Sequence, residues 1–71
     1  MTAKYFYEWE DASDPYATGY PDMGLYPQFR LRSKRAVRAA WINYVADLGP
    51  VEIARTPRLQ VWRVSIEEVT V

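Results

Sequence analysis

The chain has neither cysteine nor histidine among its 71 residues. This absence excludes disulfide bonds, thiolate and imidazole metal sites, cysteine nucleophiles and histidine general bases. No apolar run comes near the roughly 18 residues that a membrane-spanning helix requires, and the first residues, MTAKYFYEWED, lack the apolar core of a signal peptide. We therefore expect a soluble protein of the reducing cytoplasm that has no membrane contact and uses no cofactor or metal.

The chain also has few glycines and no net charge. The three glycines, Gly19, Gly24 and Gly49, are too scattered to form a glycine-rich phosphate-binding loop. Nine basic residues balance nine acidic ones, so the formal net charge is zero, and the pI is about 6.2. Domains that bind nucleic acids are typically strongly basic, so the overall charge does not favour that function.

Aromatic residues are abundant: the chain has three Trp, six Tyr and two Phe. A chain of this length is expected to form one small domain, spanning residues 1–71, with little core. Domains this small usually need disulfides or bound metals for support. An enclosed aromatic side chain buries about 150–250 Å², so we expect aromatic packing to stabilise this domain instead.

The N-terminal part of the sequence predicts two strands separated by a long loop. In KYFYEWE (4–10), three aromatic residues on one face alternate with an acidic side that we expect to face solvent. QFRLR (28–32) predicts a second strand, antiparallel to the first. Residues 11–27 between them are rich in Pro, Gly, Asp and Ser, and this composition predicts an irregular loop.

A helix is predicted between Ser33 and Gly49. Ser33 is a good N-cap, and Gly49 with Pro50 ends the pattern. Apolar residues recur at helical spacing and form one stripe: Val37, Ala40, Trp41, Tyr44, Val45 and Leu48. The residues of the opposite side are predicted to be exposed: Arg35, Arg38, Ala39, Ile42 and Ala46.

The C-terminal part predicts two further strands, VEIAR (51–55) and LQVWRVSIEEVTV (59–71), joined by a turn at TPR (56–58). A bulge is expected near Val61, because the apolar residues before and after it have opposite parity. The predicted fold class is α+β: a three- to four-stranded antiparallel sheet with one helix packed across one face, in the order ββαββ.

Cations cluster in RLRSKRAVR (30–38). The five are Arg30, Arg32, Lys34, Arg35 and Arg38. Several lie at a helix start, whose partial positive charge disfavours them unless an anion compensates. We expect Glu8 and Glu10 to share a sheet face with Arg30 and Arg32 and to pair with them. The alternative is a module that binds a nucleic-acid backbone through residues 30–38.

Carboxylates offer the main remaining route to catalysis. Glu8 with Glu10, or Asp11 with Asp14, has the composition of an acid/base pair or a Mg²⁺ site. The first pair has predicted cation partners, however, and DASDP (11–15) is ordinary turn chemistry. So small a domain also has little room for a substrate cleft of about 300–1,000 Å³. We predict that the protein is not an enzyme and has no catalytic, metal-binding or cofactor-binding residues.

Binding to another protein is then the favoured function, and three surfaces are candidates. Residues 11–27 mix small polar residues with large apolar ones, a combination typical of binding loops: Tyr16, Tyr20, Met23, Leu25 and Tyr26. The alternative for these side chains is to cap an open edge of the core. A ridge on the outer helix side is the second candidate: Arg35, Arg38 and Ile42. The third is the sheet, where an unpaired edge along VWRVSIEEVTV (61–71), or the open face, would accept another chain or form a homodimer.

The segment FRLRSKRAVRAAWINYVADLG (29–49) combines a strand, a Ser-capped helix with spaced Ala and a W..YV motif, ahead of a closing strand. Over residues 29–64 this layout resembles small bacteriophage-encoded accessory proteins and, loosely, small phage inhibitors of host RNA polymerase. The basic helix start and zero net charge depart from those inhibitors, so their mode of binding is not carried over. The resemblance implies a host-takeover or counter-defence protein that occupies a surface of a host protein. We therefore predict a non-enzymatic binding protein that inhibits or modulates a host protein.

Overall fold

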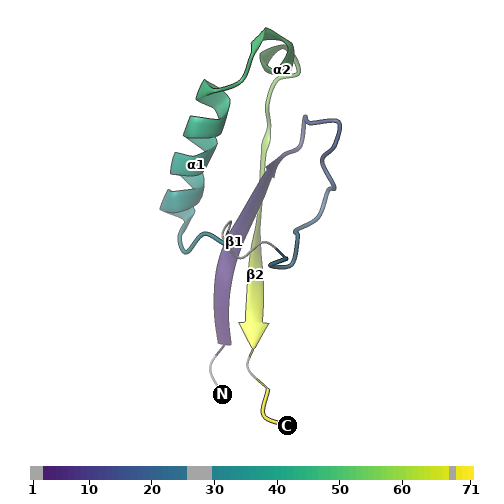
Figure 1. Ribbon diagram of the computed structural model, residues 1–71. Coiled ribbons are helices and arrows are strands. Elements are labelled where there is room, and N and C mark those ends of the chain that lie inside the picture. The colour runs from purple at the N-terminus through teal and green to yellow at the C-terminus, as the bar shows by residue number, and fades with distance from the viewer. Residues whose placement is uncertain (1–2, 26–29, 68) are drawn as a thin grey trace.

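The computed structural model describes residues 3–25, 30–67 and 69–71. Two strands and two helices follow one another as β1 (Ala3–Asp11), α1 (Lys34–Ala46), α2 (Pro50–Ala54) and β2 (Leu59–Glu67) (Figure 1). The protein is α+β, but the described residues form a sheet of only two strands. The predicted three- to four-stranded ββαββ arrangement is therefore wrong.

The first and last elements of the chain form the sheet. β1 and β2 run antiparallel in unbroken register, from Ala3 opposite Glu67 to Asp11 opposite Leu59. The predicted bulge near Val61 is wrong, because both faces of the strand pair are covered. Side chains on both faces of β2 therefore lie against a covering layer, and no change of register is needed to bury the apolar ones.

The predicted strand at residues 28–32 is reduced, in its described part, to one bridge. Leu31 and Tyr7 exchange two backbone hydrogen bonds, 2.7 Å from the Tyr7 N–H and 3.1 Å from the Leu31 N–H, in antiparallel geometry. Gln28 and Phe29 lie outside the described residues. The antiparallel direction was predicted correctly, but β1 forms its long pairing with β2.

The predicted strand VEIAR lies largely in a helix. Gly49 is the N-cap of α2 and Pro50 occupies its first turn, where the fixed φ of proline and its missing N–H suit a helix start. Thr56 then adopts a left-handed φ of 59°, and the chain enters β2. The segment TPR therefore connects a helix to a strand and is not a hairpin turn.

Helix α1 agrees with its sequence pattern. The Ser33 hydroxyl accepts the Ala36 N–H at 3.1 Å and caps the helix. Val37 is buried, Trp41 and Tyr44 are half-buried, and Ile42 on the opposite side is 59% exposed. A 3.6-residue period in the sequence was sufficient to predict which side of this helix packs.

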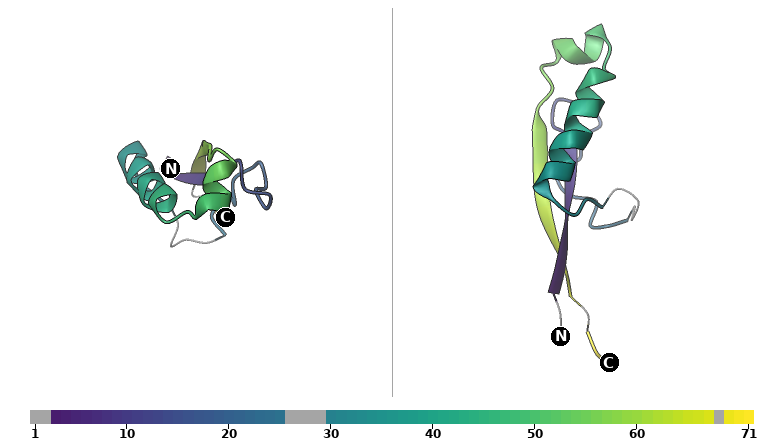
Figure 2. Two further views of the ribbon diagram at one scale, coloured as in Figure 1. Left: turned by 90° about the horizontal axis from the view of Figure 1, so that it is seen from above. Right: turned by 90° about the vertical axis from the view of Figure 1, so that its left-hand side faces the viewer.

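The strand pair lies between two covering layers, α1 on one face and the loop 12–25 on the other (Figures 1 and 2). Trp9 and Asp11 contact α1, whereas Glu8 is hydrogen-bonded to the loop. The prediction that the acidic side of β1 faces solvent is wrong, because the loop covers it. The core is thin, and its buried apolar residues are Phe6, Tyr7, Val37 and Val64. The molecule is elongated, with extents of 51 × 22 × 16 Å.

Candidate functional site

Two glutamates of β1 hold the long loop against the sheet. Glu8 is 8% exposed and accepts the backbone N–H groups of Asp22 and Gly24, the latter at 2.7 Å. Glu10 accepts the N–H groups of Thr18, at 2.9 Å, and Gly19, at 2.7 Å. Each carboxylate thus satisfies two donors of a segment that forms no regular structure of its own. The loop backbone is therefore fixed at two places along its length.

Arg30 holds the same loop at Gly24, beside the contact with Glu8. Its guanidinium donates to the Gly24 carbonyl at 2.9 Å and lies 5.0 Å from the centre of the Phe6 ring. Gly24 has a φ of 80°, and a Cβ there would come within 2.9 Å of Arg30 and 3.2 Å of Phe6. Met23 also has a left-handed φ, of 60°, although it is not glycine. Such a conformation persists only where the surroundings over-determine it.

The loop displays large apolar side chains to solvent. The exposed fraction is 90% for Tyr16, 64% for Tyr20, 71% for Met23 and 75% for Leu25. We call these four residues the loop surface. None of them caps the core, which was the alternative to a binding role, because Phe6 beneath the loop is covered by Gly24 and Arg30 instead. Tyr26, the remaining aromatic residue predicted to bind a partner, lies outside the described residues.

Asp11 joins four segments of the chain. One carboxylate oxygen accepts the Ser13 N–H at 2.9 Å, the Ser13 hydroxyl at 2.6 Å and the Arg58 N–H at 3.0 Å, and the other accepts the Tyr44 hydroxyl at 2.8 Å. Burial acts to raise the pKa of Asp11, but these hydrogen bonds outweigh it and lower the pKa to about 2. The carboxylate thus connects β1, the loop, α1 and the segment that leads into β2. It has a structural role that the sequence did not reveal.

The Asp11 partner Tyr44 belongs to an aromatic cluster beneath α1. The Trp9 ring meets Trp41 edge-on at 5.8 Å and Tyr44 at 5.3 Å, and Trp41 stacks on Tyr44 at 5.4 Å. Burial, followed by the hydrogen bond to Asp11, raises the pKa of Tyr44 to about 12. This cluster anchors α1 to β1, as the abundance of aromatic residues predicted.

The cations of residues 30–38 divide between the two faces of the sheet. On the loop side, Arg30 and Arg32 border a cavity of about 220 Å³ together with Lys4. On the helix side, Lys34 and Arg38 border a second hollow with Arg63. The predicted pairing of Glu8 and Glu10 with Arg30 and Arg32 is wrong, because both glutamates bind the loop backbone.

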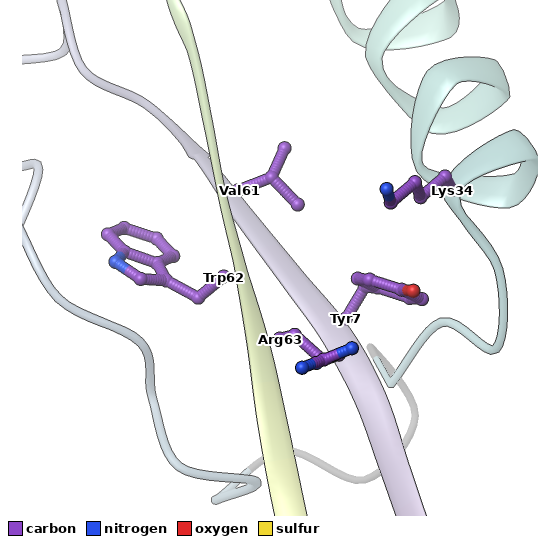
Figure 3. A pocket seen from close by; sticks show the side chains of 5 residues that line it. All are labelled: Tyr7, Lys34, Val61, Trp62 and Arg63. Atoms are coloured by element: carbon purple, nitrogen blue, oxygen red, sulfur yellow. The ribbon is translucent and has the colours of Figure 1, made fainter.

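The hollow on the helix side forms a groove between α1 and β2. Two adjoining cavities of about 340 and 230 Å³ share Lys34 and Val61. We call this feature the α1–β2 groove. Its apolar floor is formed by Tyr7, Val37, Leu59 and Val61, and the cations at its rim are Lys34, Arg38 and Arg63. Figure 3 shows Val61 and Arg63 on the side of α1, while the Trp62 side chain points to the other side of the strand. Sequence reasoning missed this groove, because it depends on which strand β2 pairs with.

The predicted partner-binding residues do not form one site. Tyr16, Tyr20 and Met23 lie in the loop on one face of the sheet. The exposed ridge of Arg35, Arg38 and Ile42 belongs to α1 on the opposite face (Figure 2). The two sets therefore offer separate surfaces, and a single small partner would contact only one of them.

Within residues 3–25, 30–67 and 69–71 no group of three or more Asp or Glu residues is placed to hold a metal ion. The helices in this part of the chain are too short and too polar to cross a membrane. Comparison of the chain with protein-family models, with curated proteins and with solved structures finds no match in any of the three.

Glu8→Gln is expected to loosen the loop. The amide offers one acceptor oxygen where the carboxylate offers two, so one of the Asp22 and Gly24 N–H groups loses its partner. We expect their amide hydrogens to exchange at least about tenfold faster, as measured by hydrogen exchange and NMR. Asp47→Asn, at the exposed end of α1, is the matched control and should leave both rates unchanged. Unchanged rates in Glu8→Gln would show that the loop is held by other contacts.

Proposed function

We propose that this protein is a non-enzymatic binding module that acts in the cytoplasm by occupying a surface of another protein through its loop surface. The supporting observation is that Tyr16, Tyr20, Met23 and Leu25 are exposed on a loop whose backbone is fixed by Glu8, Glu10 and Arg30. Exposed apolar side chains gathered on one segment mark interaction sites more often than scattered ones do.

The fixed backbone makes this loop a better binding surface than a mobile one of the same composition. A flexible loop must be ordered when its partner binds, and the lost entropy reduces affinity. Here four loop N–H groups are already bonded to β1 carboxylates before any partner arrives. Tyrosine adds large, rigid contact area with few rotatable bonds.

The resemblance of residues 29–64 to small bacteriophage accessory proteins supports a host protein as the partner. A protein of this type inhibits or modulates its target by covering a surface and needs no active site. Such a function requires no catalytic or cofactor-binding residue in this chain.

The double variant Tyr20→Ala/Met23→Ala tests the proposed surface. A partner is first isolated by affinity capture from the host and then purified, and its Kd is measured by titration calorimetry. We expect this variant to weaken binding at least about 30-fold, because it truncates two of the four exposed apolar side chains of the loop surface. The matched control, Arg35→Glu/Arg38→Glu on the opposite face, should stay within about tenfold of wild type. Wild-type affinity of the loop variant would refute the proposal.

A nucleic-acid backbone is the second candidate partner, and the exposed start of α1 favours it. Arg32, Lys34, Arg35 and Arg38 are all exposed, and the first turn of α1 contains no acidic residue. Binding through four phosphate contacts would weaken on the order of a hundredfold between about 50 and 200 mM salt. Fluorescence anisotropy with labelled DNA measures this slope, and Arg35→Glu/Arg38→Glu should reduce it. Binding through the loop surface would instead be nearly independent of salt.

A further inference from the structure

The outer edge of β2 is the longest unpaired stretch of backbone in the part of the sheet that the structure describes. β2 has nine residues, and its only strand neighbour there is β1. Such an edge presents a row of free N–H and C=O groups that another strand can pair with. Apolar side chains flank it on both faces, since Val61 on the helix side and Ile66 on the loop side are each 41% exposed.

The α1–β2 groove opens along this same edge. Helix α1 is anchored over β1 by Trp41 and Tyr44 against Trp9, and this placement leaves the floor around Val61 accessible beside β2 (Figure 3). A strand added to the edge of β2 would place its helix-side residues next to that floor, because directly opposed residues in a sheet share a face.

The sequence of β2 is complementary to itself. When two copies of β2 lie antiparallel about a two-fold axis at Ser65, Arg63 of each copy lies opposite Glu67 of the other, and Val64 lies opposite Ile66. The first pair joins opposite charges and the second joins apolar residues, and both kinds stabilise cross-strand pairing. The two-fold axis makes each pair occur twice. A two-fold axis at Arg63 would instead place two guanidinium groups opposite each other.

We infer that this protein forms a homodimer in which β2 pairs with β2 of a second copy about a two-fold axis at Ser65, and the two strand pairs form one four-stranded sheet. In this register Arg63–Glu67 of one copy pairs with the same segment of the other, and these residues all lie within β2. A two-fold, self-complementary contact is the commonest way in which identical chains associate.

The thin core supports this arrangement. Four apolar side chains are buried in the described part of the chain, and a chain of 71 residues buries a small fraction of its surface when alone. Pairing two edges removes exposed backbone and covers part of Ile66, which is 41% exposed in the single chain. In the dimer both α1 helices lie on one face of the sheet and both loops on the other. If the proposed function holds, two loop surfaces then face the same way, and binding to a multivalent partner gains from avidity.

Charge reversal in the full chain, without any partner, tests the register. Sedimentation equilibrium should give wild type twice the monomer mass of 8.3 kDa. Arg63→Glu and Glu67→Arg each place like charges opposite one another twice, and each should raise the dimer Kd at least about tenfold. The double variant Arg63→Glu/Glu67→Arg restores both pairs and should return to within about threefold of wild type. Arg35→Glu, on the exposed side of α1, is the matched control and should leave the Kd unchanged.

A single engineered cysteine tests the axis independently of these charges. The chain has no cysteine, so Ser65→Cys introduces the only thiol, and two directly opposed Cα atoms about 4.5–5.5 Å apart permit a disulfide. We expect mild oxidation to cross-link Ser65→Cys into a covalent dimer, whereas Ala46→Cys on the exposed side of α1 should stay monomeric on a denaturing gel. Three results would each overturn the inference: a monomeric wild type, a dimer Kd unchanged by Arg63→Glu and by Glu67→Arg, or no cross-link at residue 65. None of these results depends on the loop surface, so the proposed function is tested separately.

Discussion

Trp41→Ala is expected to destabilise the protein by about 3 kcal/mol, the low end of the usual cost of truncating a large aromatic residue, because Trp41 is half-buried. Trp41 lies edge-on to Trp9 and stacks on Tyr44, so its removal takes away contacts with both. A core this small rarely supplies more than about 3–5 kcal/mol of net stability. We therefore expect the variant to be largely unfolded at room temperature, with its near-ultraviolet circular dichroism lost.

Ile42→Ala is the matched control for this experiment. Ile42 is the next residue of the same helix but is 59% exposed, so its truncation opens no cavity. We expect a change within about 0.5 kcal/mol in chemical denaturation. The proposed dimer would stabilise the folded state, so both variants should be compared with wild type at one protein concentration. A Trp41→Ala protein as stable as Ile42→Ala would mean that α1 is held by something other than the aromatic cluster.

Asp11→Asn is expected to cost about 2–4 kcal/mol, through the loss of charge-assisted hydrogen bonds at a buried junction. The carboxylate has two acceptor oxygens, whereas the asparagine side chain has one acceptor oxygen and one NH2 donor. At least one of the donors on Ser13, Tyr44 or Arg58 therefore loses its acceptor. Asp14→Asn is the matched control three residues away, because the Asp14 carboxylate accepts the N–H of Tyr16 in an exposed turn. We expect it to cost less than about 1 kcal/mol.

The loss of unfolding free energy caused by Asp11→Asn should become smaller at low pH. The pKa of Asp11 is about 2 in the folded protein, against an ordinary value of 3.8. A lowered pKa means that the ionised carboxylate stabilises the fold above pH 4 and that this stabilisation is lost as the pH falls toward 2. The difference between wild type and Asp11→Asn in urea denaturation should therefore be constant above about pH 5 and shrink below pH 4. A constant difference down to pH 2 would show that the charge of Asp11 contributes nothing.

The covering of both sheet faces explains how so short a chain holds a long irregular loop in place. The helix side uses apolar packing, in which Trp9 of β1 meets α1. The loop side uses carboxylates, in which Glu8 and Glu10 of the same strand bind backbone N–H groups. Alternation along one strand thus supplies two different kinds of attachment. The loop surface and the α1–β2 groove lie on opposite sides of this strand pair, so binding at one leaves the other free.

Some of the wrong predictions had a signal in the sequence that was open to two interpretations. Gly49 and Pro50 were taken as the end of a helix, but proline in a first turn followed by Glu52 is also a helix start. The opposite parities of Val61 and Val64 were attributed to a bulge, but they equally describe a strand with both faces covered. In each case a short segment fits two structures, and only its surroundings select one.

The sequence by itself determined the local structure of the protein: the alternating faces of β1, the Ser33 cap and apolar stripe of α1, and the exposure of Ile42. Each follows from neighbours within one or two turns or a few strand residues, whose spacing fixes which side chains share a face. Only the tertiary structure decided that β1 pairs with β2 and that Glu8 and Glu10 bind the loop backbone. Such choices depend on the free energies of alternative contacts between residues up to 64 positions apart, as between Ala3 and Glu67, and no local pattern records that comparison.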